Sequence, residues 1–289
     1  MLTVCAYAKI NLTLEILGRL DDGYHQIASV MQLIGLHDTL SFKTAEDVRL
    51  ACNIPELCSP DNLVFKAARL LQETANIKRG ALINIQKNIP LDSGLGGGSS
   101  DAAATLRALN QLWETNLPIG EIRALSSKLG SDVAFFLEGG TSLVTGRGEI
   151  VSPLPPLLEL WVVLLKPPIN VSQKTRTMYA HLERKNWTSG LLTQRMATSL
   201  KHNEEIDLSL CYNVFEEVAS LCFPGLDRYR QAFQDAGAVS VHLAGAGPTL
   251  FALMNSKEKA EEIRSRLDSE VYLTQTLQML PNEMARNSQ

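Results

Sequence analysis

The chain has 289 residues, 45% of them hydrophobic and 20% charged, with a formal net charge of -4 at pH 7. This composition is typical of a globular protein and excludes a disordered or collagen-like chain. The small acidic charge gives no global reason to bind nucleic acid or an anionic membrane. At this length we expect two lobes that share a cleft.

The sequence indicates neither a membrane anchor nor a disulfide framework. Its strongest apolar run, residues 160–165, is far shorter than the roughly 20 residues of a membrane helix. Lys9 and Asn11 interrupt the apolar N-terminus, which lacks a signal-peptide pattern. The five cysteines contain no CxxC pair, which favours reduced thiols. We therefore expect a cytoplasmic protein.

Strand and helix patterns alternate irregularly along the first half. Apolar and alternating runs predict strands over residues 3–16, 38–43, 47–52 and 81–86. Helical periodicity predicts helices over 63–74, 102–113 and 119–129, followed by a hairpin over 141–150. The prolines of LPPLLEL indicate a connection near Pro155, which divides the chain into an N-terminal lobe, 1–155, and a C-terminal lobe, 156–289.

The second half opens with the buried strand pattern LWVVLL, residues 160–165. Helices are predicted near residues 176–185, 191–202, 210–221 and 257–267, and strands over 239–243, 249–254 and 271–275. The final segment PNEMARNSQ is predicted to be a frayed tail. This order of elements predicts an α+β lobe.

The stretch NIPLDSGLGGGSSDAAATL is the most informative, because a strand ends there, four glycines follow and a helix begins near residues 99–101. Glycines let backbone N–H groups approach a ligand, and a helix start adds unpaired N–H groups and partial positive charge, which suits phosphate. The alternative is a structural loop capped by Ser99 or Ser100. The loop is neither GxxxxGK[ST] nor GxGxxG, since Ser99 replaces the third glycine.

Four segments in order resemble motifs of the GHMP kinase superfamily. The glycine stretch resembles its ATP loop, and the form GLGGGSSDAA resembles that of the diphosphocytidyl-methylerythritol kinases within it. AYAKINLTLEILGRLDDGYHQI resembles the substrate motif of that family, LGSDVAFFLEGGTSLVTGRGE its aspartate motif, and HLAGAGPTLFAL its third glycine motif. NVFEEV and NVSQKTRTMYAHL are weaker matches. The resemblance implies a two-lobed α+β GHMP kinase fold with the active site in the cleft.

The resemblance also implies a nucleotide-binding set. Its members in the loop are Pro90, Leu91, Asp92, Ser93, Gly94, Leu95, Gly96, Gly97, Gly98, Ser99 and Ser100. Asn62 opens a predicted helix and is a candidate adenine contact, with helix capping as the alternative. Lys87 precedes the loop and is a candidate nucleotide contact.

Lys9 and Asp132 are the candidate catalytic pair. Taken alone, Lys9 in an apolar strand is more often a solvated edge residue, and Asp132 before the apolar run VAFFL is more often an N-cap. The resemblance joins them, because the matching lysine and aspartate of the family face each other beside the accepting hydroxyl. It implies that Asp132 is the general base and that Lys9 keeps it ionised and offsets transition-state charge.

Five residues are implied to bind the acceptor substrate. They are Asn11, Tyr24, His25, Thr175 and Tyr179. Two tyrosine faces can sandwich a pyrimidine while His25 reads its edge. The alternative is that Tyr24 and His25 are turn residues after Asp-Asp-Gly.

Three departures from the family pattern stand out. Asp92-Ser93 replaces a small pair before the glycines and places a carboxylate near the phosphates, which puts the local loop conformation in doubt. Ala244 and Ala246 replace common serines of the third motif, so backbone N–H groups remain as the donors there. Val214 stands where an aspartate is frequent.

The resemblance implies ATP-dependent phosphorylation of the 2-hydroxyl of 4-(cytidine 5'-diphospho)-2-C-methyl-D-erythritol in the non-mevalonate isoprenoid pathway. Mg²⁺ is expected to be carried largely by the nucleotide, with Ser100 as a further ligand and no dedicated metal site. The alternatives are another GHMP kinase, such as mevalonate or homoserine kinase, and a non-catalytic nucleotide-binding regulator. Asp132 argues against homoserine kinase, Tyr24-His25 argues against mevalonate kinase, and the retained Lys9 and Asp132 argue against a regulator. The oligomeric state stays open.

Overall fold

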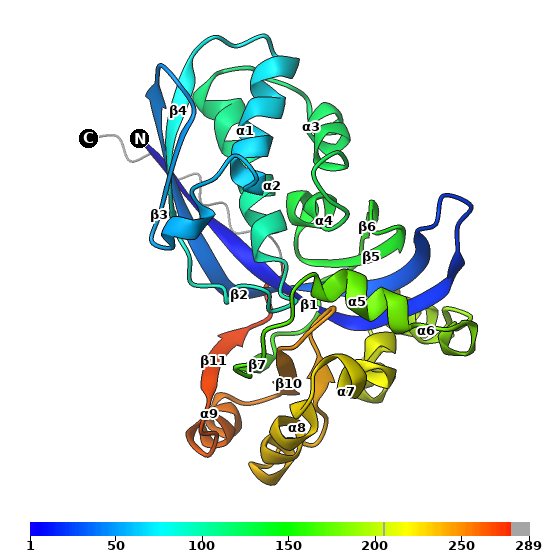
Figure 1. Cartoon of the computed structure of the whole chain (residues 1–289). Coiled ribbons are helices and arrows are strands. Elements are labelled where there is room, and N and C mark those ends of the chain that lie inside the picture. Colours follow the sequence, from blue (N-terminus) through cyan, green and yellow to red (C-terminus); the bar gives the residue numbers. More distant parts are fainter. Residues whose placement is uncertain (205, 279–289) are drawn as a thin grey trace.

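The computed structural model describes residues 1–204 and 206–278. Within these residues the chain forms two β-sheets with helices on their outer sides (Figure 1). The predicted tail, residues 281–289, lies outside the described residues. In the described part of the chain, no helix is long and apolar enough to cross a membrane.

The first sheet has seven strands among the described residues, in the order β3-β4-β2-β1-β8, with β5 paired to β2 and β6 paired to β5. The bounds are β1 Leu2–Arg19, β2 His25–Ala45, β3 Arg49–Cys52, β4 Gly80–Gln86, β5 Thr141–Gly146, β6 Ile150–Pro153 and β8 Tyr212–Asn213. β1 and β2 pair antiparallel along nearly their full length. β2 pairs with β4 through residues 39–45 and with β5 through residues 27–32, so it links the two ends of the sheet.

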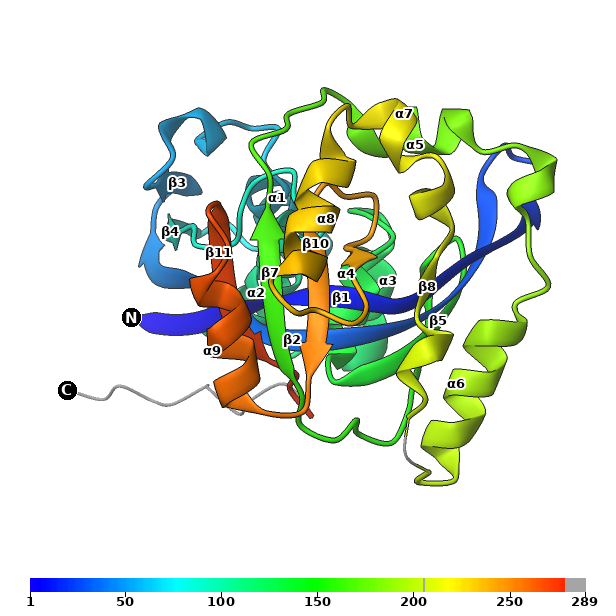
Figure 2. The ribbon, with the colours of Figure 1, turned by 90° about the horizontal axis from the view of Figure 1, so that it is seen from below.

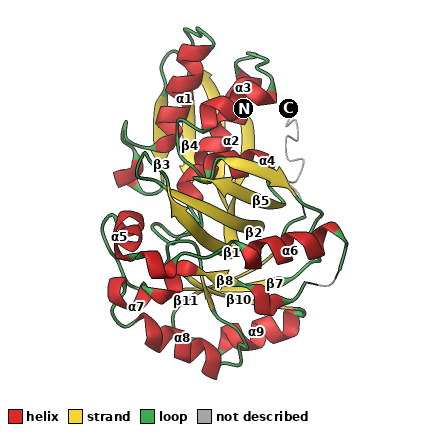
Figure 3. Ribbon diagram, turned by 90° about the vertical axis from the view of Figure 1, so that its right-hand side faces the viewer, coloured by secondary structure: helices red, strands yellow, loops and turns green. Residues whose placement is uncertain are grey.

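Four helices cover one face of this sheet in the described chain (Figure 3). They are α1 Leu63–Thr74, α2 Gly97–Leu112, α3 Ile119–Ser126 and α4 Val133–Glu138. α2 packs directly on β1 and β2 and contacts α1, α3 and α4. The helix that follows the glycine loop is therefore held against the centre of the sheet.

The second sheet has the strand order β11-β7-β10-β9 among the described residues. Its strands are β7 Trp161–Lys166, β9 His242–Leu243, β10 Leu250–Met254 and β11 Glu270–Gln275. The helices of this half are α5 Lys174–His181, α6 Leu191–Lys201, α7 Ala219–Cys222, α8 Leu226–Asp235 and α9 Lys257–Ser265. Seen from below, α8 and α9 lie in front of this sheet and β1 and β2 lie behind it (Figure 2).

The structure corrects the sequence prediction most clearly over residues 210–221, which do not form one helix. The segment contains β8, a 3₁₀ turn at Val214–Glu217 and the short helix α7. Asn213 explains the break, because its backbone is extended at φ -135° and its side chain accepts from Phe215 N at 3.0 Å. Other 3₁₀ turns lie at Pro55–Leu57, Arg184–Asn186 and Leu208–Leu210.

Smaller differences concern element lengths. The strand predicted over residues 38–43 is the second half of β2, which begins at His25. The strand predicted over 239–243 shortens to β9, and the helix predicted over 176–185 divides into α5 and a 3₁₀ turn. α8 carries a polar sequence, LDRYRQAFQD, and was not predicted.

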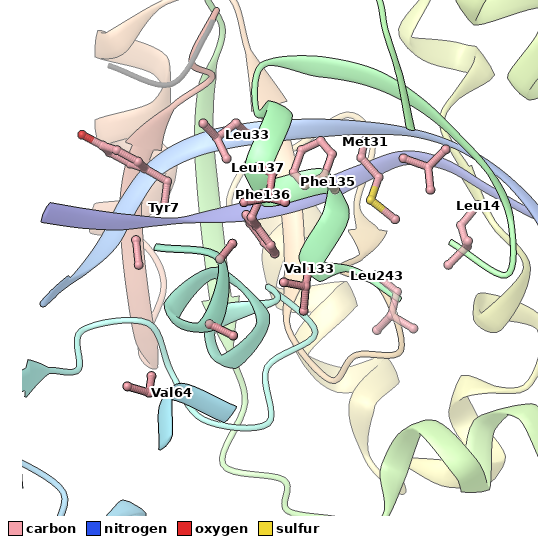
Figure 4. Packing of buried hydrophobic residues seen from close by; sticks show 14 of the residues in the cluster. Tyr7, Leu14, Met31, Leu33, Val64, Val133, Phe135, Phe136, Leu137 and Leu243 are labelled. Carbon is pink, nitrogen blue, oxygen red and sulfur yellow. The ribbon is translucent and has the colours of Figure 1, made fainter. Parts of the chain in front are cut away.

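The two faces of β1 position the candidate catalytic lysine. Ala8, Ile10 and Leu12 are at most 1% exposed and pack between the two sheets. Because side chains alternate along a strand, Lys9 points to the opposite face, which carries α2 and α4. Apolar side chains of α4 pack against β1 and β2 on that face (Figure 4). Burying one Ile or Leu stabilises by about 1.5–3 kcal/mol, so this register of β1 is strongly favoured.

Candidate active site

One cavity brings most of the predicted site residues together. Its volume is about 1300 Å³, and its walls come from β1, the β1–β2 turn, the glycine loop, α5 and the third glycine turn. Lys9, Asp132 and the five predicted acceptor-binding residues all line it. Of the loop residues, Leu95 and Ser100 are at most 3% exposed and belong to the protein interior, whereas the others line the cavity.

Lys9 and Asp132 face each other inside this cavity. Lys9 Nζ lies 3.6 Å from Asp132 Oδ2, and their side chains are 4% and 32% exposed. Lys9 is therefore no solvated edge residue: its ammonium donates to Asn11 Oδ1 at 2.7 Å, and Asn11 in turn donates to Ser29 Oγ at 2.8 Å. Asp132 stands at the N-cap of α4, but within the described residues its carboxylate makes no capping hydrogen bond. The carboxylate is thus available to a ligand in the cavity.

The glycine loop lies along the edge of β1 that faces away from β2. Lys9 N donates to Leu95 O at 3.0 Å, and the Leu95 side chain is buried between the sheets, so Leu95 anchors the loop. Gly94 and Gly96 have φ values of 84° and 77°, which favour glycine. A Cβ on Gly94 would lie 1.9 Å from Ala244 O, and one on Gly96 would lie 2.7 Å from Phe136 Cζ.

The helix after the loop begins without a side-chain cap. Gly96 is the N-cap of α2 and has no side chain to offer, so the first N–H groups of the helix are left for other partners. The alternative of a serine cap is excluded, because Ser99 and Ser100 lie inside the helix. Gly98 and Ser99 of this first turn line the cavity. An uncapped helix start beside a cavity is a suitable environment for phosphate.

Asp92 adopts φ 50° and is exposed on the cavity wall. This left-handed conformation is one that aspartate tolerates better than most residues. The departure from the family pattern therefore changes the charge of the loop without preventing its turn.

The acceptor-binding residues lie at the other end of the cavity. His25 stacks on Tyr179 with ring centroids 4.9 Å apart and an interplanar angle of 25°. Arg147 lies over the Tyr24 ring, 4.8 Å from its centroid, and forms an ion pair with Asp22. A pyrimidine between Tyr24 and Tyr179, as the sequence suggests, therefore requires the His25 ring to move out of this stack.

The pKa values of these rings follow from their surroundings. Burial, with the Arg19 charge adding to it, lowers the pKa of His25. Burial, with the Asp132 charge adding to it, raises the pKa of Tyr179 to about 12. At neutral pH both rings are uncharged, so His25 has one donor and one acceptor nitrogen.

Lys87 forms ion pairs within the protein. The prediction that it contacts the nucleotide stays untested. Lys87 touches the cavity wall, but its ammonium is paired with Asp38 and lies 2.7 Å from Asp101 Oδ2, all three side chains being at most 5% exposed. Burial opposes its charge, and the two carboxylates outweigh burial and raise its pKa. Burial raises the pKa of Asp101 to about 7, with Lys87 opposing this shift and Asp38 adding to it.

Asp38 is a supporting residue that the sequence did not reveal. Its Oδ1 accepts from Asn88 N at 2.6 Å and Ile89 N at 2.8 Å, which fixes the chain just before the glycine loop. A Cβ on Gly97 would lie 3.3 Å from Lys87 Nζ. The Asp38, Lys87 and Asp101 cluster thus lies directly beneath the loop.

Asn62 caps α1, which is the alternative that the sequence left open. Its Oδ1 accepts from Val64 N at 2.9 Å, and its Nδ2 donates to Leu57 O at 2.9 Å. Both ends of the side chain are therefore hydrogen-bonded within the protein. The adenine contact stays a prediction.

Asn213 is a second supporting residue that the sequence only hinted at. It is 1% exposed, and its Nδ2 donates at 2.8 Å to both Leu243 O and Gly245 O. These contacts hold the third glycine turn against the glycine loop, where a Cβ on Gly245 would lie 2.8 Å from Gly94 O. The two turns therefore form one continuous wall of backbone.

Two family models match the chain. They are the GHMP kinases N terminal domain, over residues 62–140, and GHMP kinases C terminal, over residues 193–273. A relative from Dehalococcoides mccartyi named 4-diphosphocytidyl-2-C-methyl-D-erythritol kinase is 43% identical over 281 residues, which are 96% of this chain and 99% of the relative. A protein of the same name from Geobacillus kaustophilus is 39% identical, with 92% of each chain covered.

Solved structures agree with the sequence relatives. A 4-(cytidine 5'-diphospho)-2C-methyl-D-erythritol kinase matches with a TM-score of 0.78 and 30% identity, covering 95% of this chain and 98% of its own. Homoserine kinase from Cytophaga hutchinsonii matches with a TM-score of 0.74 at 21% identity over 96% and 95% of the two chains, which shows a shared fold. The predicted two-lobed GHMP kinase fold is confirmed, and the chain belongs to the 4-diphosphocytidyl-2-C-methyl-D-erythritol kinase family.

Proposed function

We propose that this protein transfers the γ-phosphate of ATP to the 2-hydroxyl of 4-(cytidine 5'-diphospho)-2-C-methyl-D-erythritol, a step of the non-mevalonate isoprenoid pathway. One observation carries the proposal: the Lys9 and Asp132 pair lines the same cavity as the glycine loop. The names of relatives at 39–43% identity supply the acceptor. The site thus combines a phosphate-binding wall with an acid–base pair, as phosphoryl transfer requires.

The glycine loop and the start of α2 are the proposed binding site for the ATP triphosphate. Backbone N–H groups of the first helical turn, with Gly98 and Ser99 on the cavity wall, would donate to phosphate oxygens. Lys87 stabilises this wall from beneath through its two carboxylate partners. The phosphates are thereby bound by backbone whose position is fixed by packing.

Mg²⁺ is proposed to accompany the nucleotide. Among residues 1–204 and 206–278, no group of three His, Cys, Asp or Glu side chains lies close enough to hold a metal ion. This fits the usual binding of Mg²⁺ through substrate phosphates, water and one or two side chains. Asp92, Ser99 and Asp132 are cavity-lining residues whose side chains would offer oxygen ligands to the ion, whereas Ser100 is buried at 3% exposure. When bound, the ion would neutralise phosphate charge.

A methyl group on Gly98 is expected to weaken ATP binding without destabilising the protein. The Cβ of Gly98→Ala would meet only Leu63 Cδ1, at 3.9 Å, and alanine is favoured over glycine in a helix by about 0.5–1 kcal/mol. On the cavity side the methyl crowds the phosphates, and loss of one backbone hydrogen bond would lower affinity about tenfold. Calorimetry with ATP and a melting curve measure the two effects.

Gly96→Ala is the contrasting variant. Its Cβ meets Phe136 and its φ is 77°, so it is expected to lose stability as well. An ATP affinity of Gly98→Ala equal to that of the original protein would place the phosphates elsewhere.

At the acceptor side, Asp132 is proposed to take the proton of the hydroxyl as its oxygen attacks the γ-phosphorus. Lys9 is fixed by Asn11 and orients the Asp132 carboxylate through their ion pair. Its positive charge also offsets the negative charge that develops on the phosphoryl oxygens. Arrangement in one cavity gives the positioning that makes such a transfer efficient.

The cytidine end of the acceptor is proposed to lie against Tyr24, His25 and Tyr179, with Asn11 and Thr175 contacting the rest of the acceptor. A neutral His25 can donate to and accept from a base edge, and the tyrosines provide stacking faces. We further propose that residues 1–155 and 156–289 act as two lobes, since every described strand of the first sheet except β8 lies before residue 155 and every described strand of the second sheet lies after it.

Specificity is expected to lie in the cytidine group, and a substrate panel tests the proposed function. Turnover should be efficient for the cytidine-linked alcohol and poor for free methylerythritol, mevalonate and homoserine, because remote binding energy orients the hydroxyl. Tyr24→Ala and His25→Ala should lower kcat/KM for the cytidine-linked substrate by about 10–10³-fold.

Tyr229→Ala is the matched control, because Arg228 lies over that ring at 4.7 Å on α8, outside the described cavity wall. Equal kcat/KM values for the cytidine-linked alcohol and any other acceptor would contradict the assignment of the substrate.

A further inference from the structure

A lysine at the start of α5 lines the cavity. Lys174 is partly buried, lines the cavity and donates from Nζ to Gly247 O in the third glycine turn at 2.7 Å. Both Lys174 and Thr175 lie in the segment NVSQKTRTMYAHL, but the family resemblance assigned a role only to Thr175.

Charged side chains from four parts of the fold act on the Lys174 ammonium. Those that act on it most are Lys9 on β1, Asp92 in the glycine loop, Lys166 on β7 and Asp132 at the start of α4. Asp92 belongs to the proposed nucleotide side, and Lys9 with Asp132 to the acceptor side. The hydrogen bond to Gly247 O fixes the ammonium on the third glycine turn, where a Cβ on Gly245 would lie 2.8 Å from Gly94 O and 3.0 Å from Lys9 Nζ. This turn thus adjoins both the glycine loop and the candidate catalytic pair.

The other titratable groups of α5 lie further along the helix, and one of them, Arg176, is a second cation on the cavity wall. Tyr179 lies one turn on, and His181 Nδ1 contacts Cys222 Sγ of α7 at 3.5 Å. Burial raises the pKa of Cys222, and Tyr179 is uncharged below about pH 12. Neither thiol nor phenol supplies a counter-charge for Lys174 at neutral pH.

Resting on the proposed function, we propose that Lys174 is a further catalytic residue whose ammonium contacts an oxygen of the phosphoryl group during its transfer from ATP to the acceptor. The Lys174 ammonium is partly desolvated and is repelled by the charge of Lys9. An anion that lies between the two lysines would therefore stabilise both charges. In the step, the bond from the γ-phosphorus to the ADP oxygen breaks and its electron pair stays on ADP. The acceptor oxygen forms the new bond, its proton goes to Asp132, and Lys174 keeps its own proton.

Burial lowers the pKa of Lys174 to about 8, and the Lys9 charge adds to this. The free enzyme therefore carries a protonated Lys174 below about pH 8 and loses this charge above it. A bound phosphate would hold the proton to higher pH, since an opposite charge favours the charged form.

Two substitutions separate charge from structure. Lys174→Gln retains a donor for Gly247 O without the charge, and Lys174→Arg retains the charge. We expect Lys174→Gln to lower kcat by about 10²–10³-fold, the usual effect of removing one donor to a transition-state oxyanion. Its affinity for ADP should change by less than about threefold, while its affinity for ADP with aluminium fluoride and acceptor, a mimic of the transferring phosphoryl group, should fall with kcat. Lys174→Arg should recover at least about tenfold of the lost kcat.

The pH dependence gives an independent readout. In the original enzyme kcat/KM should decrease above about pH 8, and this decrease should be absent in Lys174→Arg because arginine does not titrate there. Lys185→Gln is the matched control: this exposed lysine pairs with Glu183 at 3.0 Å and lies outside the described cavity wall, so its kcat should be unchanged.

The inference is overturned if Lys174→Gln turns over at the original rate, or if the Gln and Arg variants lose activity equally together with thermal stability. Should Lys174→Gln not fold, an unchanged alkaline decrease in Lys174→Arg overturns it. Failure of the proposed function looks different, because the original enzyme would then not phosphorylate the cytidine-linked alcohol at all.

Discussion

Asp132→Asn is expected to lower kcat by about 10²–10⁴-fold while the affinity for ATP stays almost unchanged. The asparagine is the same size and leaves α4 intact, since within the described residues the Asp132 carboxylate makes no capping hydrogen bond. It cannot, however, accept the proton of the acceptor hydroxyl. Steady-state kinetics with the cytidine-linked alcohol, together with calorimetry for ATP, measure the two quantities.

Substitution of Lys9, the ion-pair partner of Asp132, tests whether the two residues act together. Lys9→Met should lower kcat to a similar extent, and the double variant should lose little more than either single variant, because the two residues lie 3.6 Å apart and act as one unit. Asp61→Asn is a suitable control, since Asp61 is 96% exposed and pairs with Lys66 at 3.3 Å on the surface. If the fold-decreases in kcat of the two single variants multiply in the double variant, Lys9 and Asp132 act independently.

Lys87→Met is expected to have the largest effect on stability, about 3–5 kcal/mol. The substitution leaves the Asp38 and Asp101 carboxylates buried without their shared cation, and Asp101 Oδ1 already has no hydrogen-bond partner among the described residues. Asp101 would then take up a proton more readily, which limits the loss. Denaturant unfolding at neutral pH measures the change in free energy.

Lys66→Met is the matched control, because it removes a solvent-exposed lysine–aspartate ion pair, worth about 0–1 kcal/mol. Lys87→Met should also weaken ATP binding, because Gly97 of the glycine loop packs over Lys87. Asp38, the partner of Lys87, holds Asn88 and Ile89 just before that loop. A loss of stability no larger than that of Lys66→Met would mean that the buried cluster contributes little.

Much of the fold could be predicted from local pattern. Apolar alternation identified β1, β4 and the β5–β6 hairpin, and helical periodicity identified α1, α6 and α9. The first half of β2 and the helix predicted over 210–221 could not be resolved in this way. Pairing with β1 and β5 makes residues 25–37 a strand, and the hydrogen bonds of Asn213 to a distant turn prevent the helix. Both effects are tertiary and leave no local signal.

Part of the candidate site could likewise be predicted from the sequence, and part of it could not. The glycine loop could be predicted to be an anion site from its residues alone, whereas joining Lys9 to Asp132 needed the family resemblance, because 123 positions separate them in the chain. Asp38, Lys174 and Asn213 act through contacts made by folding: an ion cluster, a turn carbonyl and a pair of backbone acceptors. Each of these residues has an ordinary sequence context, so structure was required to find it.

The central claim is that phosphate is transferred to the 2-hydroxyl of the cytidine-linked alcohol, and phosphorus NMR of the product tests it most directly. That hydroxyl is on a carbon that bears a methyl group and no hydrogen. Proton-coupled spectra should therefore show a new phosphomonoester singlet, with one ADP formed per product and the acceptor's diphosphate signals retained. A phosphomonoester split by neighbouring protons, or ADP formed with free phosphate and no new ester, would contradict the account.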